Sequence, residues 1–378
     1  MPINFPEKRT LIISLRKLKY HVSRAAIYEF EDVISACDSV DLLELDYHPE
    51  FFKVTNNLSN QALHFSKISQ YLNPLPGRKI DIKKEYEVLF FFSQSIKDIL
   101  ALNSVKGWRS KCKFAICWMD EIWEKDIEKY RNHLNLLDQF DAIFMNFSSS
   151  LDEVQKLLKR PCYPIHYGVD ALAFTHPQVP IRSIDMLSVG RRSSITHESM
   201  VELADTGDFF YVYDTLNGLN MKYYKYHRSL YKNLLKRSNF VLVNKAKFDL
   251  LGTSNPQEEV GPRFFEGAAS GAIMLGYAPV CQPFQENFDW PDAVIEIPFD
   301  CPNIGEVLQD LRSQTERLES IRRDSMVNAL LRHDWVYRWE YILTTCGLDS
   351  LPILSKRKVQ LQEVSQGLNP LHKSWVEH

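Results

Sequence analysis

The sequence predicts an α/β protein made of two domains, each a parallel β-sheet between helices. Its 378 residues are many for a single hydrophobic core and favour two. Short apolar runs alternate with amphipathic stretches, as in the strand–helix–strand units of parallel sheets. Residues 175–182 (THPQVPIR) carry two prolines near the middle of the chain, which is typical of an inter-domain linker.

The first half of the chain contains the apolar runs of one sheet. Residues 86–92 (YEVLFFF) are almost continuously apolar, as expected for a central strand covered on both faces. Residues 16–21 (RKLKYH) contain no glycine, so the backbone there cannot approach a ligand as closely as a glycine turn allows. The other predicted strands are 10–15, 41–45, 114–118, the end of 136–147 and 168–170, and the predicted helices are 23–36 and 51–75.

The second half of the chain shows the same alternation of short apolar runs and amphipathic stretches. Residues 184–189 are predicted to form its first strand, with Gly190, Arg191 and Arg192 at the carboxyl end. We expect 223–236 to be a basic helix that buries its tyrosines. The tail beyond about residue 356 is polar, and we expect it to be loosely held. The other predicted elements are strands at 211–213, 240–244 and 293–297 and a long helix at 305–330.

Charge and cysteine usage exclude several classes of protein. A formal net charge of −3 gives no electrostatic reason to expect a nucleic-acid partner. The seven cysteines are scattered without the spacing of a zinc site, so we expect reduced thiols in a cytoplasmic protein. The apolar run near the start is too short for a signal peptide, and no stretch is long enough to span a membrane. Peripheral contact with a membrane surface stays open.

Residues 258–271 (EEVGPRFFEGAASG) are the most informative stretch. Glu258 lies in a loop rich in turn formers, and Glu266, after seven intervening residues, is predicted to open a small-residue helix that Gly271 ends. Residues 272–275, before Gly276, are predicted to form a buried strand. Carboxylates accept hydrogen bonds from vicinal hydroxyls, and a helix start offers N–H groups to phosphate. The stretch therefore predicts a site for a phosphorylated sugar.

This stretch resembles the E-x7-E signature of retaining glycosyltransferases of the GT-B fold, and R-F-F-E-G-A-A-S-G-A is similar to the motif of bacterial glycosyltransferase family 1/4-like proteins. The resemblance implies two Rossmann-like domains facing a central cleft. It implies an N-terminal acceptor domain at 1–174, a linker at 175–182, a nucleotide-sugar domain at 183–330, and a C-terminal helix at 331–378 that crosses back to the first domain and ends in a tail.

The resemblance also implies the activity: transfer of a hexosyl group from a UDP- or GDP-linked sugar to an acceptor hydroxyl, with retention and without metal or cofactor. The acceptor stays unspecified among natural products, lipids and polysaccharides. In the family the first Glu contacts the sugar and the second the ribose. The implied catalytic residues are Glu258 and Asp120, and the implied donor-binding residues are Glu266, Arg191, Lys245, Arg263, Gly190 and Gly261.

Two assignments stay open within this interpretation. Asp120 can present a carboxylate to the acceptor hydroxyl, or it can cap the helix that follows it. Lys245 and Lys247 both follow a predicted strand, and either can neutralise a departing diphosphate. Three other functions also stay open: a nucleotide-sugar epimerase of the same fold, a non-catalytic scaffold, and a periplasmic-type binding protein, which the missing signal peptide disfavours. Fold alone does not decide among them.

Overall fold

The structure is a computed structural model that describes residues 8–62, 71–77, 79–175, 181–215, 221, 223–245 and 257–368. The contacts between Cα atoms divide the chain into two compact units. The first unit comprises Met1–His166 and Trp339–Ile353, and the second comprises Tyr167–Arg338 and Leu354–His378. Each unit contains one main parallel sheet, so the predicted α/β class is confirmed.

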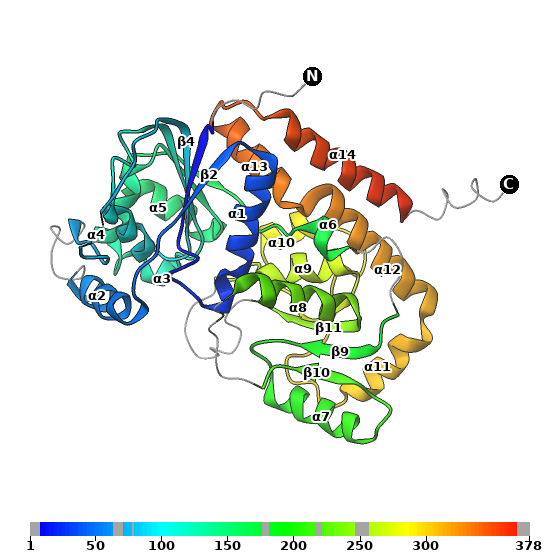
Figure 1. Cartoon of the computed structure of the whole chain (residues 1–378). Coiled ribbons are helices and arrows are strands. Elements are labelled where there is room, and N and C mark those ends of the chain that lie inside the picture. Colours follow the sequence, from blue (N-terminus) through cyan, green and yellow to red (C-terminus); the bar gives the residue numbers. More distant parts are fainter. Residues whose placement is uncertain are drawn as a thin grey trace. The chain divides into compact units, whose positions relative to one another are not determined.

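The first unit is built on a six-stranded sheet of order β2-β1-β4-β6-β7-β8 (Figure 1). Every neighbouring pair in it is parallel. Strand β4 lies inside the sheet and is buried along nearly its whole length, as its apolar sequence predicts. The strands are β1 (Thr10–Ser14), β2 (Val40–Glu44), β4 (Tyr86–Ser93), β6 (Cys112–Met119), β7 (Ala142–Met145) and β8 (Cys162–Pro164), with a separate pair of β3 (Ile80–Asp81) and β5 (Val105–Lys106).

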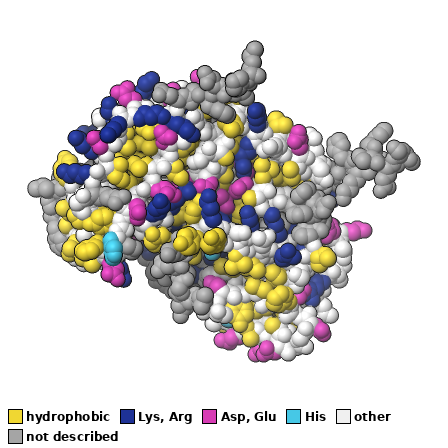
Figure 2. Space-filling view, viewed as in Figure 1, with side chains coloured by type: hydrophobic (Ala, Val, Ile, Leu, Met, Phe, Trp, Pro, Cys, Tyr) yellow, Lys and Arg dark blue, Asp and Glu magenta, His cyan; other side chains and the backbone are white. Residues whose placement is uncertain are grey.

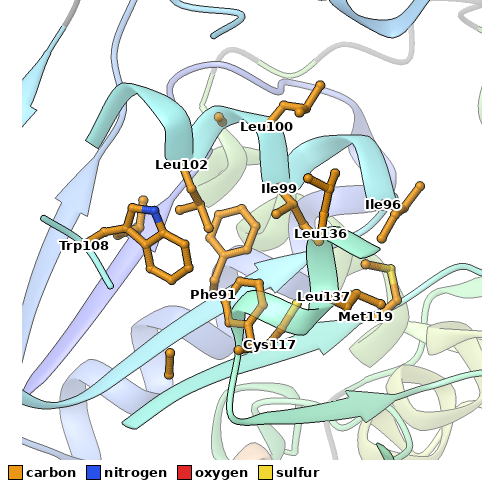
Figure 3. Packing of buried hydrophobic residues seen from close by; sticks show 14 of the residues in the cluster. Phe91, Ile96, Ile99, Leu100, Leu102, Trp108, Cys117, Met119, Leu136 and Leu137 are labelled. Atoms are coloured by element: carbon orange, nitrogen blue, oxygen red, sulfur yellow. The ribbon is translucent and has the colours of Figure 1, made fainter. Parts of the chain in front are cut away.

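Short helices connect these strands and cover the sheet. They are η1 (Val22–Arg24), α1 (Ala25–Cys37), α2 (Pro49–Ala62), η3 (Ile96–Ser104), α3 (Glu124–Ile127), α4 (Arg131–Leu134), η4 (Asn135–Gln139), η5 (Ser148–Ser150) and α5 (Leu151–Leu157). Figure 3 shows the core on one face of the sheet, where Phe91 and Cys117 of the central strands meet Ile99 of η3 and Leu137 of η4. All four side chains are at most 1% exposed, which anchors the segments after β4 and β6.

The second unit is built on a five-stranded parallel sheet of order β10-β9-β11-β12-β13. Its strands are β9 (Ile184–Ser188), β10 (Tyr211–Tyr213), β11 (Ser238–Asn244), β12 (Ile273–Tyr277) and β13 (Ile295–Glu296). Its helices include α6 (Ala171–Phe174), α7 (Ser194–Asp205), α8 (Tyr224–Lys236), α9 (Pro262–Ser270), α10 (Gln282–Asn287), α11 (Ile304–Ser313), α12 (Thr315–Asn328), the π-helix η6 (Ala329–His333) and α14 (Pro352–Gly367). Helix α13 (Trp335–Thr345) begins in this unit and continues into the first.

Several predicted boundaries were wrong. Helix α9 begins at Pro262, so Glu266 lies in its middle rather than at its start, while Gly271 ends it at a φ of 67° as predicted. The predicted helix 305–330 is broken at Gln314 into α11 and α12. Residues 168–170 form no strand of the first sheet: β8 is its last strand, and Asp170 instead caps α6 by accepting from the Ala173 N–H (3.2 Å).

The expectation of a loosely held tail was also wrong up to residue 368. Residues 352–367 form α14, and Arg357 on it donates to Asp170 (2.6 Å) and to the buried Asp334 (2.8 Å). Predicted helix 51–75 ends at Ala62, and residues 71–75 are not α-helical. Helix α8 buries Tyr231 but leaves Tyr226 74% exposed, so its tyrosines do not all face inward.

The seven cysteines are free thiols, and Cys162, Cys281 and Cys346 are only partly buried. Within the described ranges, no helix is both long and apolar enough to cross a membrane.

Candidate functional site

The second sheet brings polar side chains together at its carboxyl edge. All of its strands run parallel, so the segments that follow them emerge on one side, which is where open α/β sheets bind ligands. Gly190 follows β9, Asp214 follows β10, Lys245 follows β11 and Val280 follows β12. The amino end of α9, which carries Arg263, lies at this same edge because it contacts Gly190.

Glu258 and Lys245 form an ion pair at this edge. The ammonium group of Lys245 lies 4.3 Å from the ring centroid of Tyr277, the last residue of β12. The second carboxylate oxygen of Glu258 accepts a hydrogen bond from the backbone N–H of Val280 (2.6 Å). The side chains of Glu258 and Lys245 keep 22% and 17% of their exposure. Both groups are therefore held in place yet accessible to a ligand.

The amino terminus of α9 is a second feature of the edge. Gly261 is the N-cap and Pro262 the first helical residue, so the N-cap residue itself has no side chain that could accept from the first-turn N–H groups. A Cβ on Gly261 would meet no described atom within 4 Å. A residue larger than glycine therefore fits at the N-cap, and the helix end carries a partial positive charge. Such an end favours an anionic ligand.

Arg263, in the first turn of α9, lies against Gly190. Gly190 has a φ of +86°, and a Cβ there would overlap the Arg263 guanidinium. The Gly190 N–H donates to Asp214 Oδ1 (2.9 Å), which fixes the turn after β9. The glycine is needed at this position both for its backbone conformation and for the close approach of the arginine.

Arg192, which the sequence did not single out, is tied down beside this turn. It donates from Nη1 to Asp214 Oδ1 and from Nη2 to the Asp214 carbonyl oxygen, both at 2.6 Å. Burial alone would raise the pKa of Asp214, but hydrogen bonds from Arg192 and the Gly190 N–H outweigh it and hold that pKa below its ordinary value. Arg191, the residue predicted from the sequence, is exposed. The two arginines are adjacent, so sequence pattern could not rank them.

Glu266 lies in a different environment from Glu258. It is 4% exposed and forms an ion pair with Arg228 of α8, which is 7% exposed. The Arg228 guanidinium lies 4.8 Å from the ring centroid of Phe174. Burial and the negative charge of Glu266, whose carboxylate accepts a hydrogen bond from Tyr231, raise the pKa of that phenol. Glu266 is thus an interior carboxylate that the structure has already paired.

Asp120 lies at the carboxyl end of β6 in the first unit. It is 1% exposed, and its Oδ1 accepts from Asn146 Nδ2 (3.2 Å). Helix α3 begins only at Glu124, with Trp123 at its N-cap, so the interpretation of Asp120 as an N-cap was wrong. Asp120 also lies within electrostatic range of Arg24. It therefore belongs to a buried polar group at the edge of the first sheet.

The glycine-free loop after β1 is anchored by a buried arginine. Arg16 is 9% exposed and donates to Glu31 (2.7 Å), Asp32 (2.9 Å) and the hydroxyl of Ser14 (3.2 Å). Burial raises the pKa of Glu31, against the attraction of Arg16. The loop is therefore fixed by side-chain contacts rather than by a tight glycine turn.

Two predictions concern features that are not placed at the site. Lys247, the alternative to Lys245, lies outside the described residues. Over the described ranges, no group of three or more His, Cys, Asp or Glu side chains has the arrangement of a metal site.

Comparisons with known proteins bear on the fold. No protein-family model and no curated protein sequence matches the chain. Its structure is similar to that of Anabaena Alr3699/HepE in complex with UDP-glucose, at 12% identity and a TM-score of 0.51, covering 90% of this chain and 99% of that one. It is also similar to an α-glucosyltransferase in complex with UDP and a 13-mer DNA containing a central A:G mismatch, at 12% identity and a TM-score of 0.52 over 89% and 99% of the two chains.

A further structure of an α-glucosyltransferase, in complex with UDP-glucose and DNA containing an abasic site, matches at 11% identity and a TM-score of 0.50 over 88% and 98% of the two chains. At such low sequence identity, the structural similarity shows the fold alone. It confirms the predicted fold class, an α/β chain of the GT-B type whose two units are each Rossmann-like.

Proposed function

We propose that this protein is a glycosyltransferase that moves a hexosyl group from a nucleotide-sugar donor to an acceptor hydroxyl. One observation carries the proposal. The amino end of α9 with its glycine N-cap, Arg263 on its first turn, and the Lys245–Glu258 pair all lie at the carboxyl edge of the second parallel sheet. This edge offers fixed positive charge to a diphosphate and a carboxylate to a sugar.

The positive groups suit the leaving group of the reaction. Negative charge grows on the diphosphate as the bond to the anomeric carbon breaks, so groups already oriented toward it stabilise the transition state more than the ground state. Arg263 can donate two parallel hydrogen bonds to phosphate oxygens, and Lys245 supplies a compact point charge. With these groups in place we propose a reaction that needs neither metal nor cofactor, with Gly190 and Gly261 giving the phosphates room.

Glu258 is proposed to bind the transferred sugar. Its carboxylate is paired with Lys245, and arrival of the diphosphate would give the lysine a second anion to contact. The carboxylate then becomes an acceptor for sugar hydroxyls. The E-x7-E resemblance supports retention of the anomeric configuration. Asp120 is proposed to act on the acceptor side, at the edge of the first sheet.

For Glu266 we propose two contributions. One is the ribose contact that the resemblance suggests, and the other is indirect, through the ion pair with Arg228 that fixes its carboxylate. The carboxylate offers about four lone-pair sites, and Arg228 and Tyr231 already use some of them. Arg191 is exposed and placed after β9, where it can reach a phosphate without breaking the Arg192–Asp214 pair. A uridine nucleotide is the first donor to test, because the similar structures were solved with UDP or UDP-glucose. We propose that the protein works in the cytoplasm, where nucleotide sugars are made.

Proton NMR of the protein incubated with UDP-, GDP-, ADP- and dTDP-sugars tests this proposal. Release of nucleoside diphosphate together with an α-configured sugar product from an α-linked donor is the expected result. Conversion of the donor to its epimer with no release of nucleotide would show the epimerase instead. A donor that binds but is never consumed, with any acceptor offered, would indicate a scaffold protein. Glu258→Gln should abolish the release while donor binding persists.

A further inference from the structure

Three lysines gather at the carboxyl edge of the first sheet. Lys19 follows β1, Lys97 lies in the first turn of η3 after β4, and Lys129 follows α3 after β6. Strands β1, β4 and β6 are neighbours in the sheet and run parallel. The three lysines therefore come from three consecutive strand ends on one side of the unit.

Two of the lysines converge on one aromatic ring. The Nζ atoms of Lys97 and Lys129 lie 5.5 and 5.3 Å from the ring centroid of Tyr130. Neither ammonium group forms an ion pair with a carboxylate in the described part of the chain. Lys19 lies 5.2 Å from the ring centroid of Phe52 and 3.7 Å from Asp98 Oδ1.

The one carboxylate of this cluster is already compensated. Asp98 is 3% exposed, and its Oδ2 accepts from Arg24 Nη2 (2.7 Å) and from the backbone N–H groups of Gln94 (3.1 Å) and Ser95 (3.2 Å). Its negative charge therefore balances the buried arginine. Asp98 also pairs with Lys19, so Lys97 and Lys129 are left as an excess of positive charge.

The lysines also repel one another. Burial lowers the pKa of Lys97, and the neighbouring charge of Lys129 lowers it further. Burial likewise lowers the pKa of Lys19 against the attraction of Asp98, with smaller contributions from Arg24 and then Lys97 in the same direction as burial. Like charges held near one another are destabilising unless an anion joins them, and more so where one of them, here Lys97, is partly buried. An anion beside Tyr130 gains from the charges of Lys97 and Lys129, with Lys19 close enough to add to the local positive charge.

We propose that Lys19, Lys97 and Lys129 form a binding site for a phosphoryl group carried by the glycosyl acceptor. The proposal rests on the glycosyltransferase function proposed above and narrows its acceptor to a phosphorylated compound. Lysine is a compact charge with three rotatable donors, which suits the spread of oxygens on a phosphoryl group. The Tyr130 ring holds the ammonium groups of Lys97 and Lys129 beside it through cation–π contacts.

A nucleic-acid acceptor fits these observations less well. Three lysines match one phosphoryl group rather than a row of phosphates. Figure 2 shows Lys and Arg side chains interspersed with Asp and Glu over the visible face instead of forming one continuous basic surface. The net charge of −3 also opposes non-specific binding to a polyanion.

The test is calorimetric titration of the full-length protein with sn-glycerol 3-phosphate and with inorganic phosphate, in the presence of saturating UDP. UDP fills the proposed donor site, so a phosphate seen binding then uses another site. The variants are the double substitution Lys97→Met with Lys129→Met, and Lys113→Met as the matched control. Lys113 is an exposed lysine at the amino-terminal end of β6, the opposite end of the strand that leads to Lys129.

We expect glycerol phosphate to bind the wild type and the Lys113→Met control equally. The double variant should bind on the order of a hundredfold more weakly, with roughly tenfold lost for each charged hydrogen bond. UDP should bind all three proteins alike, and the double variant should unfold no earlier than the wild type because it loses a repulsion. Equal binding of glycerol phosphate by the double variant and the wild type would overturn the proposal. A wild type that binds UDP but not glycerol phosphate would overturn it as well.

Two further arms identify the source of the phosphoryl group. The first arm is co-sedimentation with phosphatidylcholine vesicles that either contain or lack phosphatidic acid. Sedimentation of the wild type only with the vesicles that contain phosphatidic acid, while the double variant stays in the supernatant, would place the phosphate on a lipid. Duplex DNA that binds more tightly than glycerol phosphate through the same two lysines would replace the proposal with a nucleic-acid acceptor. A wild type that does not bind UDP contradicts the proposed donor site alone, since phosphate binding is then measured without UDP.

Discussion

At the scale of single residues, the candidate site depends on contacts that a small change removes. Gly190 has the backbone conformation that L side chains rarely adopt and leaves the space that the Arg263 guanidinium fills. The Glu258 side chain is 22% exposed beside Lys245, whereas Glu266 is interior beside Arg228. Replacing Glu258 and replacing Glu266 should therefore affect the stability of the protein differently, although both residues belong to one motif.

Gly190→Ala should weaken donor binding through Arg263. The new methyl group overlaps the guanidinium and forces it away, which loses charged hydrogen bonds worth on the order of tenfold or more in affinity. The positive φ adds a stability cost of ~1–2 kcal/mol. Gly207→Ala is the control, because Gly207 has a φ of +90° and a Cβ there meets no described atom within 4 Å. Calorimetry with UDP should show weaker binding for Gly190→Ala only; equal binding by both variants would contradict the placement of Arg263.

Arg228→Met should destabilise the protein strongly. The substitution leaves the Glu266 carboxylate buried without its cation, and removing one partner of a buried ion pair costs ~3–5 kcal/mol. Glu258→Gln removes a partly exposed partner of Lys245 and should cost under ~1 kcal/mol. Urea unfolding of both variants measures the difference. Similar losses for the two would show that Glu266 is not the structural carboxylate described here.

At the scale of elements, two features lead to predictions. They are the amino end of α9, where we expect the donor to bind, and the π-helix η6, which carries the buried His333. Helix α9 is terminated by Gly271 with its left-handed backbone and has Gly261 as its N-cap. Leaving a helix start uncapped costs stability, because a capping side chain typically contributes ~1 kcal/mol. The glycine N-cap therefore forgoes that stabilisation at an edge where we expect an anionic ligand.

Gly261→Asp should raise stability and abolish nucleotide binding. The aspartate fits without strain, caps the first-turn N–H groups and places a negative charge where we expect the diphosphate. Gly261→Asn is the control, since it caps the helix through a neutral amide. We expect both variants to melt slightly above the wild type, with UDP binding lost in the aspartate variant and largely kept in the asparagine variant. Unchanged binding by Gly261→Asp would remove α9 from the donor site.

His333 should make the stability of the second unit depend on pH. Its Nε2 lies 2.8 Å from the Asn287 carbonyl oxygen and its ring packs on Phe265, with centroids 5.1 Å apart. Burial, followed by the charges of Arg338 and Arg332, holds its pKa well below the ordinary value. The folded state therefore cannot take up the proton that the unfolded chain binds below pH ~6.5.

The free energy of unfolding should consequently fall by up to ~1.4 kcal/mol for each pH unit below ~6.5 and be unaffected by this residue above it. Urea unfolding between pH ~7.5 and ~5.5 measures the slope. His333→Gln, which can still donate to the Asn287 carbonyl, should flatten the slope. It should not abolish it, because burial also lowers the pKa of His197 and His227. An unchanged slope in the variant would show that His333 is not the group responsible.

At the scale of the whole molecule, sequence predicted the sheets better than the site. Apolar runs such as 86–92 report burial on both faces, and they located β4 and β11 closely. The same signal missed α14, because only Leu354, Leu361 and Ser365 of that helix are buried. A mostly exposed helix carries little apolar periodicity, and its anchor Arg357 pairs with residues far away in sequence.

Only those features of the site that depend on residues close together in the sequence could be predicted. The loop, helix and strand of 258–277 and the lysine after β11 followed from turn formers and apolar runs. The partners could not be predicted. Arg228 reaches Glu266 from 38 residues away, and Arg192 rather than Arg191 binds Asp214. Which side chain from a distant element fills a position depends on the packing of the whole unit, and a single sequence does not report that.

The central claim is that a nucleotide-sugar binds at the carboxyl edge of the second sheet. Thermal unfolding of the wild type, Arg263→Met and Arg317→Met, each with UDP, GDP, ADP and dTDP and their sugars, tests it most directly. Arg317 is the control, since it pairs with Asp292 (2.7 Å) on the surface of the same unit. One nucleotide at about a hundred times its wild-type Kd should stabilise the wild type and Arg317→Met by ~2.7 kcal/mol, and Arg263→Met, with an affinity at least about tenfold lower, by ~1.4 kcal/mol or less. Stabilisation of none of the proteins by any nucleotide, or of all three alike, would contradict the claim.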